Sequence, residues 1–266
     1  MNRPTINIQG KEIKLKSFIS GKRYVNEMFD FKGIQSIPTD VIPFGYRDAM
    51  VKAKFLLSNQ PEGDCVGFAC KQAEEIQDII NGRPYTPYSA EFIYTQGKML
   101  EGQPITNDNG LETRDGAWVS KYIGMCAQSL CPDDGTWFGK ASTMEQLNDA
   151  VSRKNTWFYN VLTVPGMLKV MADKWIPRIG VPLFDSIEGV KSDGIIPMPQ
   201  AGEAIVGGHD MTLADVTMLS GKPYFSIPQT WGEEVGDCGW MYLPFYYFPT
   251  VVNTFNQAWD CYISTK

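Results

Sequence analysis

The clearest hydrophobic pattern in the chain is a helical one that begins at Cys65. The apolar positions that follow are spaced as on one helix face: Val66, Ala69, Ala73, Ile76 and Ile80. Asp64 is a favourable N-cap residue, and Asn81-Gly82 provides a stop signal. The sequence therefore predicts a helix over 65–80 whose first residue is a cysteine.

The rest of the first half is also mainly helical, with helices predicted over 89–100 and 111–123. Between them lies a polar loop in which Asn107-Asp108-Asn109-Gly110 resembles part of a calcium loop. The later bidentate glutamate is missing, so we interpret this segment as a turn. Residues 38–48 are expected to be extended.

The alternation of apolar and polar residues over 1–45 predicts an N-terminal extension of short strands. The apolar members are Ile6, Ile8, Ile13 and Leu15, and Gly10-Lys11 and Gly21-Lys22 mark turns.

The second half of the chain is richer in strand patterns. Helices are expected over 144–153 and 164–175, and strands over 157–162, 178–184, 209–219, 224–227 and 239–243. This order indicates an α+β protein of two lobes. We place a helical lobe carrying the cysteine at 46–140 and a β-rich lobe carrying a histidine at 141–266.

Composition and charge narrow the classes of partner. The chain has 266 residues and a net charge of −6, which argues against nucleic acid or an anionic membrane surface as a partner. No apolar run is long enough to span a bilayer, and the N-terminus has no apolar signal core. We expect a cytoplasmic protein, with association with a virion as the alternative.

Six cysteines and a single histidine limit the chemistry. Without a signal peptide, free thiols are expected rather than disulfides. Cys65 and Cys70 would point about 140° apart on a helix, so they should not share a zinc ion. Since His209 is the only histidine, multi-histidine metal sites are excluded, and we expect neither a metal nor a cofactor.

Cys65 combines several features of a nucleophile. The positive end of a helix dipole favours thiolate there, and Gln60 could point an amide N–H into the same space. The alternative is a buried cysteine on a core helix. His209 lies 144 residues further on, which is within the spacing of nucleophile and base in papain-like enzymes.

Three motifs in this order resemble the papain-like cysteine peptidases, most closely the compact bacterial and phage members. They are Gln60…Gly63-Asp64-Cys65-Val66-Gly67-Phe68-Ala69, then Gly207-Gly208-His209-Asp210, then Gln229-Thr230-Trp231-Gly232…Gly236-Asp237-Cys238-Gly239-Trp240. The resemblance runs from about residue 38 to the end of the chain. It implies a papain-like two-lobe fold, with an N-terminal helical lobe and a C-terminal antiparallel β-barrel-like lobe.

The resemblance also implies a role for each matched residue. Cys65 would attack, His209 would take and return the proton, and Gln229 would orient the imidazole. Gln60 and the Cys65 N–H would bind the oxyanion. An extended peptide would bind near residues that the resemblance places along the groove: Gly67, Gly207, Gly208 and Trp231.

Several positions depart from the family pattern. Gln229 stands where Asn is usual, and its extra methylene moves the amide by about 1.5 Å. Gln60 lies five residues before Cys65 instead of six, so Asn59 could serve in its place. Asp64 puts a carboxylate beside the thiol, which would raise the thiol pKa. Asp210 replaces the usual small residue after the histidine.

The resulting hypothesis is a thiol peptidase acting on a peptide or protein substrate through a Cys/His pair and an acyl-enzyme. The departures leave open a second hypothesis, an inactive papain-like scaffold that binds a protein assembly partner, for example in a phage particle. A transglutaminase-like or amidase activity on the same pair is a third.

Overall fold

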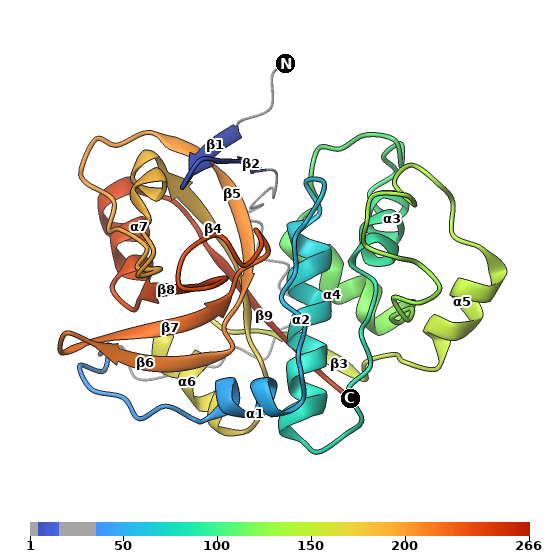
Figure 1. The fold of residues 1–266 in the computed structure, drawn as a ribbon, viewed down its shortest axis with the longest axis horizontal. Coiled ribbons are helices and arrows are strands. Elements are labelled where there is room, and N and C mark those ends of the chain that lie inside the picture. The colour runs from blue at the N-terminus through green and yellow to red at the C-terminus, as the bar shows by residue number, and fades with distance from the viewer. Residues whose placement is uncertain (1–4, 16–35) are drawn as a thin grey trace.

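Helix α2 (Cys65–Ile80) runs between a helical side and a strand-rich side of the molecule (Figure 1). The computed structural model describes residues 5–15 and 36–266. The helix begins and ends where the sequence predicts. Asp64 occupies the N-cap position but makes no side-chain capping hydrogen bond, so its predicted capping role is wrong.

The helical side consists of α3 (Ala90–Leu100), α4 (Thr113–Tyr122) and α5 (Met144–Val151). The Ser89 hydroxyl caps α3 by accepting the Phe92 N–H at 3.0 Å. Ala150 of α5 joins a core cluster with Phe92 of α3. These three helices confirm the predicted ones to within three residues, whereas the proposed lobe boundary at residue 140 stays a prediction.

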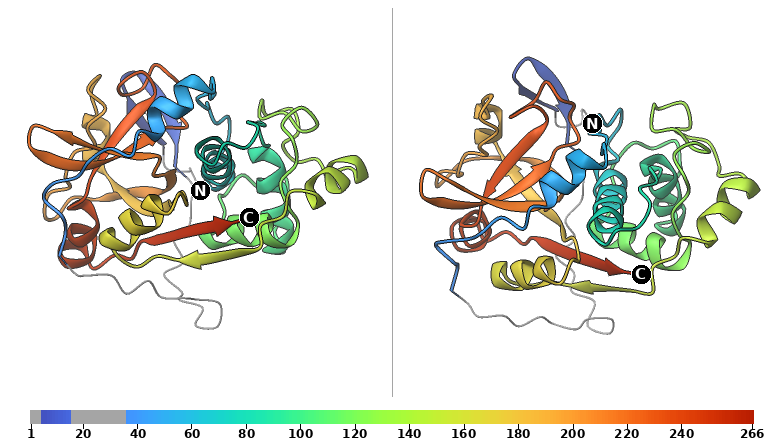
Figure 2. Two further views of the ribbon diagram at one scale, coloured as in Figure 1. Left: turned by 90° about the horizontal axis from the view of Figure 1, so that it is seen from below. Right: turned by 60° about the horizontal axis from the view of Figure 1, so that its bottom comes forward.

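The strand-rich side contains two antiparallel sheets (Figure 2). One has the order β3-β9-β4-β5, from β3 (Trp157–Asn160), β9 (Asp260–Thr265), β4 (Arg178–Phe184) and β5 (Ile205–Thr212). The other has the order β6-β7-β8, from β6 (Asp215–Leu219), β7 (Lys222–Pro228) and β8 (Trp240–Pro244). Among the described residues neither sheet closes into a barrel, so the lobe is barrel-like only in a loose sense.

The single strand predicted over 209–219 is wrong, because the chain changes sheets within it. Leu213 and Ala214 separate β5 from β6. The Leu213 N–H donates to Pro177 O, whereas the Ala214 N–H donates to Ser226 O, in the other sheet. Both residues are apolar and buried, so the hydrophobic pattern continues across the break and gives no turn signal.

The N-terminal extension forms a hairpin of β1 (Thr5–Ile8) and β2 (Lys11–Lys14). Its strands are short, as expected, and their alternating apolar side chains enter the large core of the strand-rich side: Ile6, Ile8, Ile13 and Leu15. The predicted turn at Gly21-Lys22 lies outside the described residues.

Helix α1 (Tyr46–Lys52) replaces the end of the predicted extended segment. Its start is stabilised by a residue distant in sequence, because the Asp215 carboxylate accepts the N–H groups of Phe44 and Tyr46, each at 2.8 Å. A cap from so far along the chain leaves no local signature, which explains the incorrect prediction.

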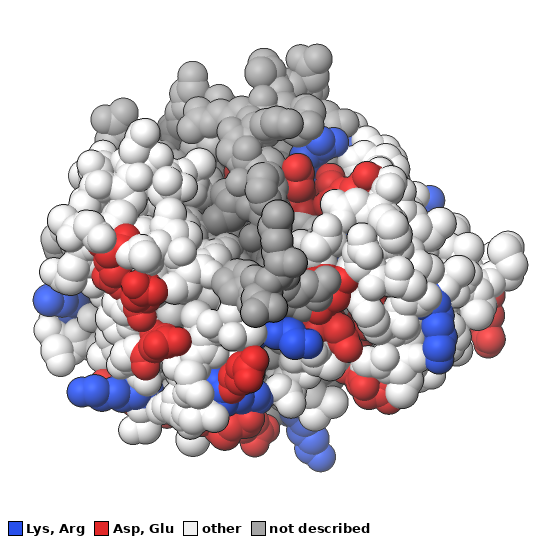
Figure 3. Space-filling view, turned by 90° about the horizontal axis from the view of Figure 1, so that it is seen from above, with Lys and Arg blue, Asp and Glu red and all other residues white. Residues whose placement is uncertain are grey.

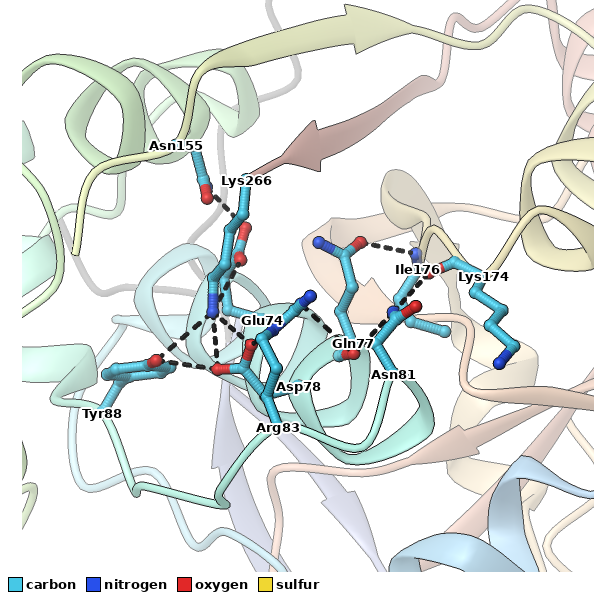
Figure 4. Close-up of polar contacts among 10 residues, drawn as sticks. All are labelled: Glu74, Gln77, Asp78, Asn81, Arg83, Tyr88, Asn155, Lys174, Ile176 and Lys266. Carbon is cyan, nitrogen blue, oxygen red and sulfur yellow. Dashed lines mark hydrogen bonds and ion pairs between the residues drawn. The ribbon is translucent and has the colours of Figure 1, made fainter.

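Three further elements complete the structure: α6 (Val164–Ala172), a 3₁₀ turn (Asp185–Gly189) and α7 (Tyr247–Phe255). Neither α7 nor β9 is predicted by the pattern. Strand β9 nevertheless lies inside its sheet and leads the chain end to α2, where Lys266 contacts Asp78 and Tyr88 (Figure 4). On the same helix, Gln77 accepts the Ile176 N–H. The C-terminal half of α2 is therefore bound both by the end of the chain and by the segment that precedes β4.

The surface agrees with an acidic chain. On the face shown in Figure 3, charged side chains are scattered in small groups, and the described residues form no extended basic patch there. No helix in the described ranges has the length and apolar character needed to cross a membrane.

Candidate active site

Cys65 and His209 lie on two elements that pack side by side, α2 and β5. The Thr212 hydroxyl donates to the Ala69 carbonyl at 3.0 Å and joins strand to helix. Cys65 precedes Ala69 by one helical turn, and His209 precedes Thr212 by three residues. The segments next to them are also joined, because the Gln60 N–H donates to Thr230 O and Gln229, just before Thr230, contacts His209. Both Cys65 and His209 are buried.

The orientation of the His209 ring is fixed by Gln229. His209 Nε2 lies 3.0 Å from Gln229 Oε1, so the longer side chain still reaches the imidazole. The Thr230 N–H also donates to Gln229 Oε1, at 2.7 Å. Of the two terminal atoms of the Gln229 amide, only the oxygen can accept a hydrogen bond, so this second contact identifies the atom that faces the histidine.

This arrangement selects one tautomer of the neutral imidazole. Because Gln229 presents an oxygen, His209 Nε2 must carry the hydrogen and Nδ1 must carry the lone pair. Within the described residues, Nδ1 is buried and has no hydrogen-bond partner. Burial lowers the pKa of His209 to about 4, against a smaller opposing effect of Gln229, so the ring is neutral at pH 7 and can act as a base.

Trp231 covers the histidine. Its ring is stacked on the imidazole with a centroid separation of 4.6 Å and an interplanar angle of 27°, and it is buried. The stacked indole shields the His209–Gln229 hydrogen bond from water.

Gln60 lies beside the same segment. Its N–H donates to Thr230 O at 2.8 Å, and its side-chain oxygen accepts from the Thr230 hydroxyl. Its amide nitrogen donates to Glu62 O at 3.0 Å. The side-chain oxygen of Asn59, the alternative to Gln60, instead accepts from Lys11 at 2.8 Å.

Asp64 has both carboxylate oxygens buried next to the cysteine. Burial raises the pKa of Asp64 well above its usual range, and Glu91, Asp133 and Glu62 raise it further. The raised pKa favours the neutral, protonated form of this carboxyl. In the protonated form it opposes thiolate formation less than the sequence suggests.

Solved structures with a similar fold are cysteine proteases. Xylellain from Xylella fastidiosa has a TM-score of 0.71 at 22% identity, over 96% of this chain and 98% of its own. ProCathepsin B S9 from Trypanosoma congolense has a TM-score of 0.71 at 11% identity, over 98% and 91%. Bromelain from Ananas comosus, in complex with the E64 inhibitor, has a TM-score of 0.62 at 18% identity, over 86% and 99%.

The chain has the papain-like fold. This confirms the fold class that the motifs imply. At these identities the likeness concerns the fold alone. No protein-family model matches the sequence, and no curated protein sequence matches it either.

The glycines predicted to bind substrate occupy different surroundings in this papain-like fold. Gly67 is turned towards α3, since a Cβ there would lie 2.4 Å from Ala90 O. Gly208 pairs with Pro182 of β4. Gly207 lies against the N-terminal extension, where a Cβ would be 2.7 Å from the Cβ of Leu15.

The hairpin extension also reaches the segments around Cys65 and His209. Lys11 contacts the Trp231 carbonyl and the Glu234 carboxylate in addition to Asn59. The sequence does not predict these contacts, because Lys11 is about fifty residues from Asn59 and more than two hundred from Trp231. With Leu15 beside Gly207, the extension covers part of the segment expected to bind substrate.

Asp108 is a further residue whose role the sequence does not reveal. Its carboxylate accepts the Gly63 N–H at 2.8 Å and is 94% buried. The segment predicted as a turn thus anchors the residues that lead into Cys65. Leu111, just after it, packs in one cluster with Cys65.

Asp210, which departs from the family pattern, has a partner on the next strand. Its carboxylate lies 3.0 Å from Arg178 Nη1, and both side chains are buried. Arg178 also donates to Thr113 O at 2.6 Å. The pair links β4, β5 and α4 next to His209, so Asp210 is a structural feature of the site.

None of the six cysteines, all of which lie in the described part of the chain, forms a disulfide, as expected. Cys65 and Cys70 fall in separate core clusters, in agreement with the argument against a shared zinc ion.

Proposed function

We propose that this protein is a cysteine peptidase that cleaves peptide bonds through Cys65 and His209. The observation that carries the proposal is the fixed imidazole. Gln229 and Thr230 hold it in the tautomer whose Nδ1 is basic, and Thr230 also accepts the N–H of Gln60 in the segment that leads into Cys65. The papain-like fold supports the same reading.

In the proposed mechanism, His209 Nδ1 takes the Cys65 proton and the thiolate attacks the scissile carbonyl carbon. The imidazolium then gives this proton to the leaving amine, which leaves an acyl-enzyme. A water molecule, deprotonated by the same nitrogen, hydrolyses the thioester and releases the new carboxyl group. Gln229 stabilises the imidazolium through Nε2, which remains a donor throughout.

The oxyanion would be bound at the start of α2. The Cys65 N–H lies at a helix N-terminus, where unpaired N–H groups and the helix dipole favour negative charge. Gln60 would add a second donor: its amide nitrogen carries two hydrogens, and Glu62 O accepts one of them.

A peptide library digested in H₂¹⁸O with an added primary amine tests the reaction class. We expect cleaved peptides whose new C-termini carry ¹⁸O from solvent, because water resolves the acyl-enzyme. Amine incorporation without cleavage would indicate the transglutaminase-like alternative. Binding without either product would support the inactive scaffold and contradict the proposal.

A further inference from the structure

Three carboxyl groups converge in the turn before Cys65 and on the first turn of α3. One oxygen from each of Glu62, Asp64 and Glu91 lies within 4.8 Å of the other two. Glu62 is half-buried, whereas Asp64 and Glu91 are 0% and 1% exposed. The group therefore lies below the surface with one member reaching towards solvent.

The carboxyl groups of the two buried members, Asp64 and Glu91, have no hydrogen-bond partner among the described residues. In the part of the chain that the structure describes, both oxygens of Asp64 and both oxygens of Glu91 are buried without a hydrogen bond. Buried carboxyl oxygens are nearly always hydrogen-bonded, because leaving them unpaired is unfavourable. Buried, unpaired oxygens of two carboxyl groups, one from each lying close to a third carboxyl, indicate a missing positive charge.

The surroundings increase the negative charge. Asp133 accepts the Glu91 N–H at 3.1 Å, next to the group. The nearby cation, Lys71, is already bound to Asp133 at 2.7 Å and lies 3.8 Å from Glu75. Burial, with Glu62, Asp133 and Asp134, raises the pKa of Glu91 to about 8. Either protons or a cation must neutralise the group.

We infer that Glu62, Asp64 and Glu91 form a binding site for Ca²⁺. Three carboxylates offer up to six oxygens and no nitrogen or sulfur, a set that suits a hard cation. The three oxygens lie within 4.8 Å of one another, so a single ion can contact all three. Ca²⁺ accepts roughly six to eight oxygens in a flexible geometry, whereas Mg²⁺ requires a near-ideal octahedron and usually keeps several waters, so a buried set of carboxylates favours Ca²⁺.

The site would act on the turn that joins Gln60 to Cys65. Glu62 and Asp64 both belong to that turn, so a shared ion would hold it in place. The ion would also offset two of the three negative charges of the ionised group beside the thiol and so favour thiolate relative to the ionised group without metal. This effect on Cys65 rests on the proposed function, whereas the binding site itself does not.

Calorimetric titration of EDTA-treated full-length protein with CaCl₂ tests the inference. We expect one site with a Kd between roughly 10⁻⁵ and 10⁻³ M. At a hundredfold excess over Kd, the melting temperature should rise by roughly 5 °C or more. D64N and E91Q keep the side-chain shapes and remove one charged ligand each, so each should weaken binding at least about tenfold.

D134N is the matched control, since it removes a neighbouring charge that is not one of the three ligands; it should change Kd less than about threefold. Absence of Ca²⁺ binding at millimolar concentration would overturn the inference, as would unchanged binding in both D64N and E91Q. Tighter binding of Mg²⁺ would overturn the choice of ion. Calcium binding without peptide cleavage would contradict only the proposed function.

Discussion

Cys65→Ala is expected to abolish peptide hydrolysis, with a fall in kcat/KM on the order of 10⁴-fold or more. In the proposed mechanism the Cys65 sulfur forms the covalent intermediate, and alanine offers no nucleophile. We expect no other cysteine to replace it, because the proposal pairs His209 with Cys65, whose preceding segment is bound to Thr230 next to Gln229. The fall is measured with a fluorogenic peptide that the wild-type protein cleaves.

Cys70→Ala provides the matched control. Cys70 is on the same helix and is also buried, but it packs with Ile93 and Val119 in a different cluster. Burial raises the pKa of its thiol to about 12, which disfavours a nucleophilic role. We expect kcat/KM to change less than about threefold. Activity that survives Cys65→Ala and disappears with Cys70→Ala would contradict the assignment.

Arg178→Met is expected to lower the free energy of unfolding by about 3–5 kcal/mol. The substitution leaves the Asp210 carboxylate buried without its ionic partner and removes the hydrogen bond to Thr113 O. Chemical denaturation, followed by tryptophan fluorescence, measures the change.

The double variant Arg178→Met/Asp210→Asn separates loss of the pair from loss of packing. It removes both charges together, so it should be more stable than Arg178→Met alone. A single variant as stable as the wild type would show that the buried pair is not needed. A double variant less stable than the single one would show that packing of Arg178, rather than its charge, matters.

The helix that carries the nucleophile could be predicted from the sequence because its signals are local. Apolar spacing gave its length, and Asp64 and Asn81-Gly82 gave its ends. The role of His209 could be predicted for a different reason: it is the only histidine in the chain, and two glycines precede it.

The contacts that complete the site could not be predicted in this way. Thr230 fixes the Gln229 oxygen through its backbone, an interaction that does not depend on its side chain. Asp108 and Arg178 act on partners 45 and 32 residues away. Local periodicity carries no information about such pairs. For this reason Asp210 appears from the sequence alone to be an unfavourable substitution, because its partner Arg178 cannot be identified there.

The same limit applies to the fold. Asp215 caps α1 from 169 residues away, and the chain changes sheets at Leu213-Ala214 without a polar residue. Both features depend on neighbours in space. The sequence therefore predicted most elements, whereas it missed α1, the break between β5 and β6, and the C-terminal helix and strand.

The central claim is that His209 takes the Cys65 proton. It is tested most directly by the pH dependence of Cys65 alkylation by iodoacetamide, resolved by peptide mass spectrometry, in the wild type and in His209→Ala. Limited access to a buried sulfur lowers the rate at every pH but leaves the apparent pKa unchanged. We predict an apparent pKa at least about 2 units below the free-thiol value of about 8.5 in the wild type, and a return to about 8.5 or above in His209→Ala. Apparent pKa values near or above 8.5 in both proteins would contradict the account.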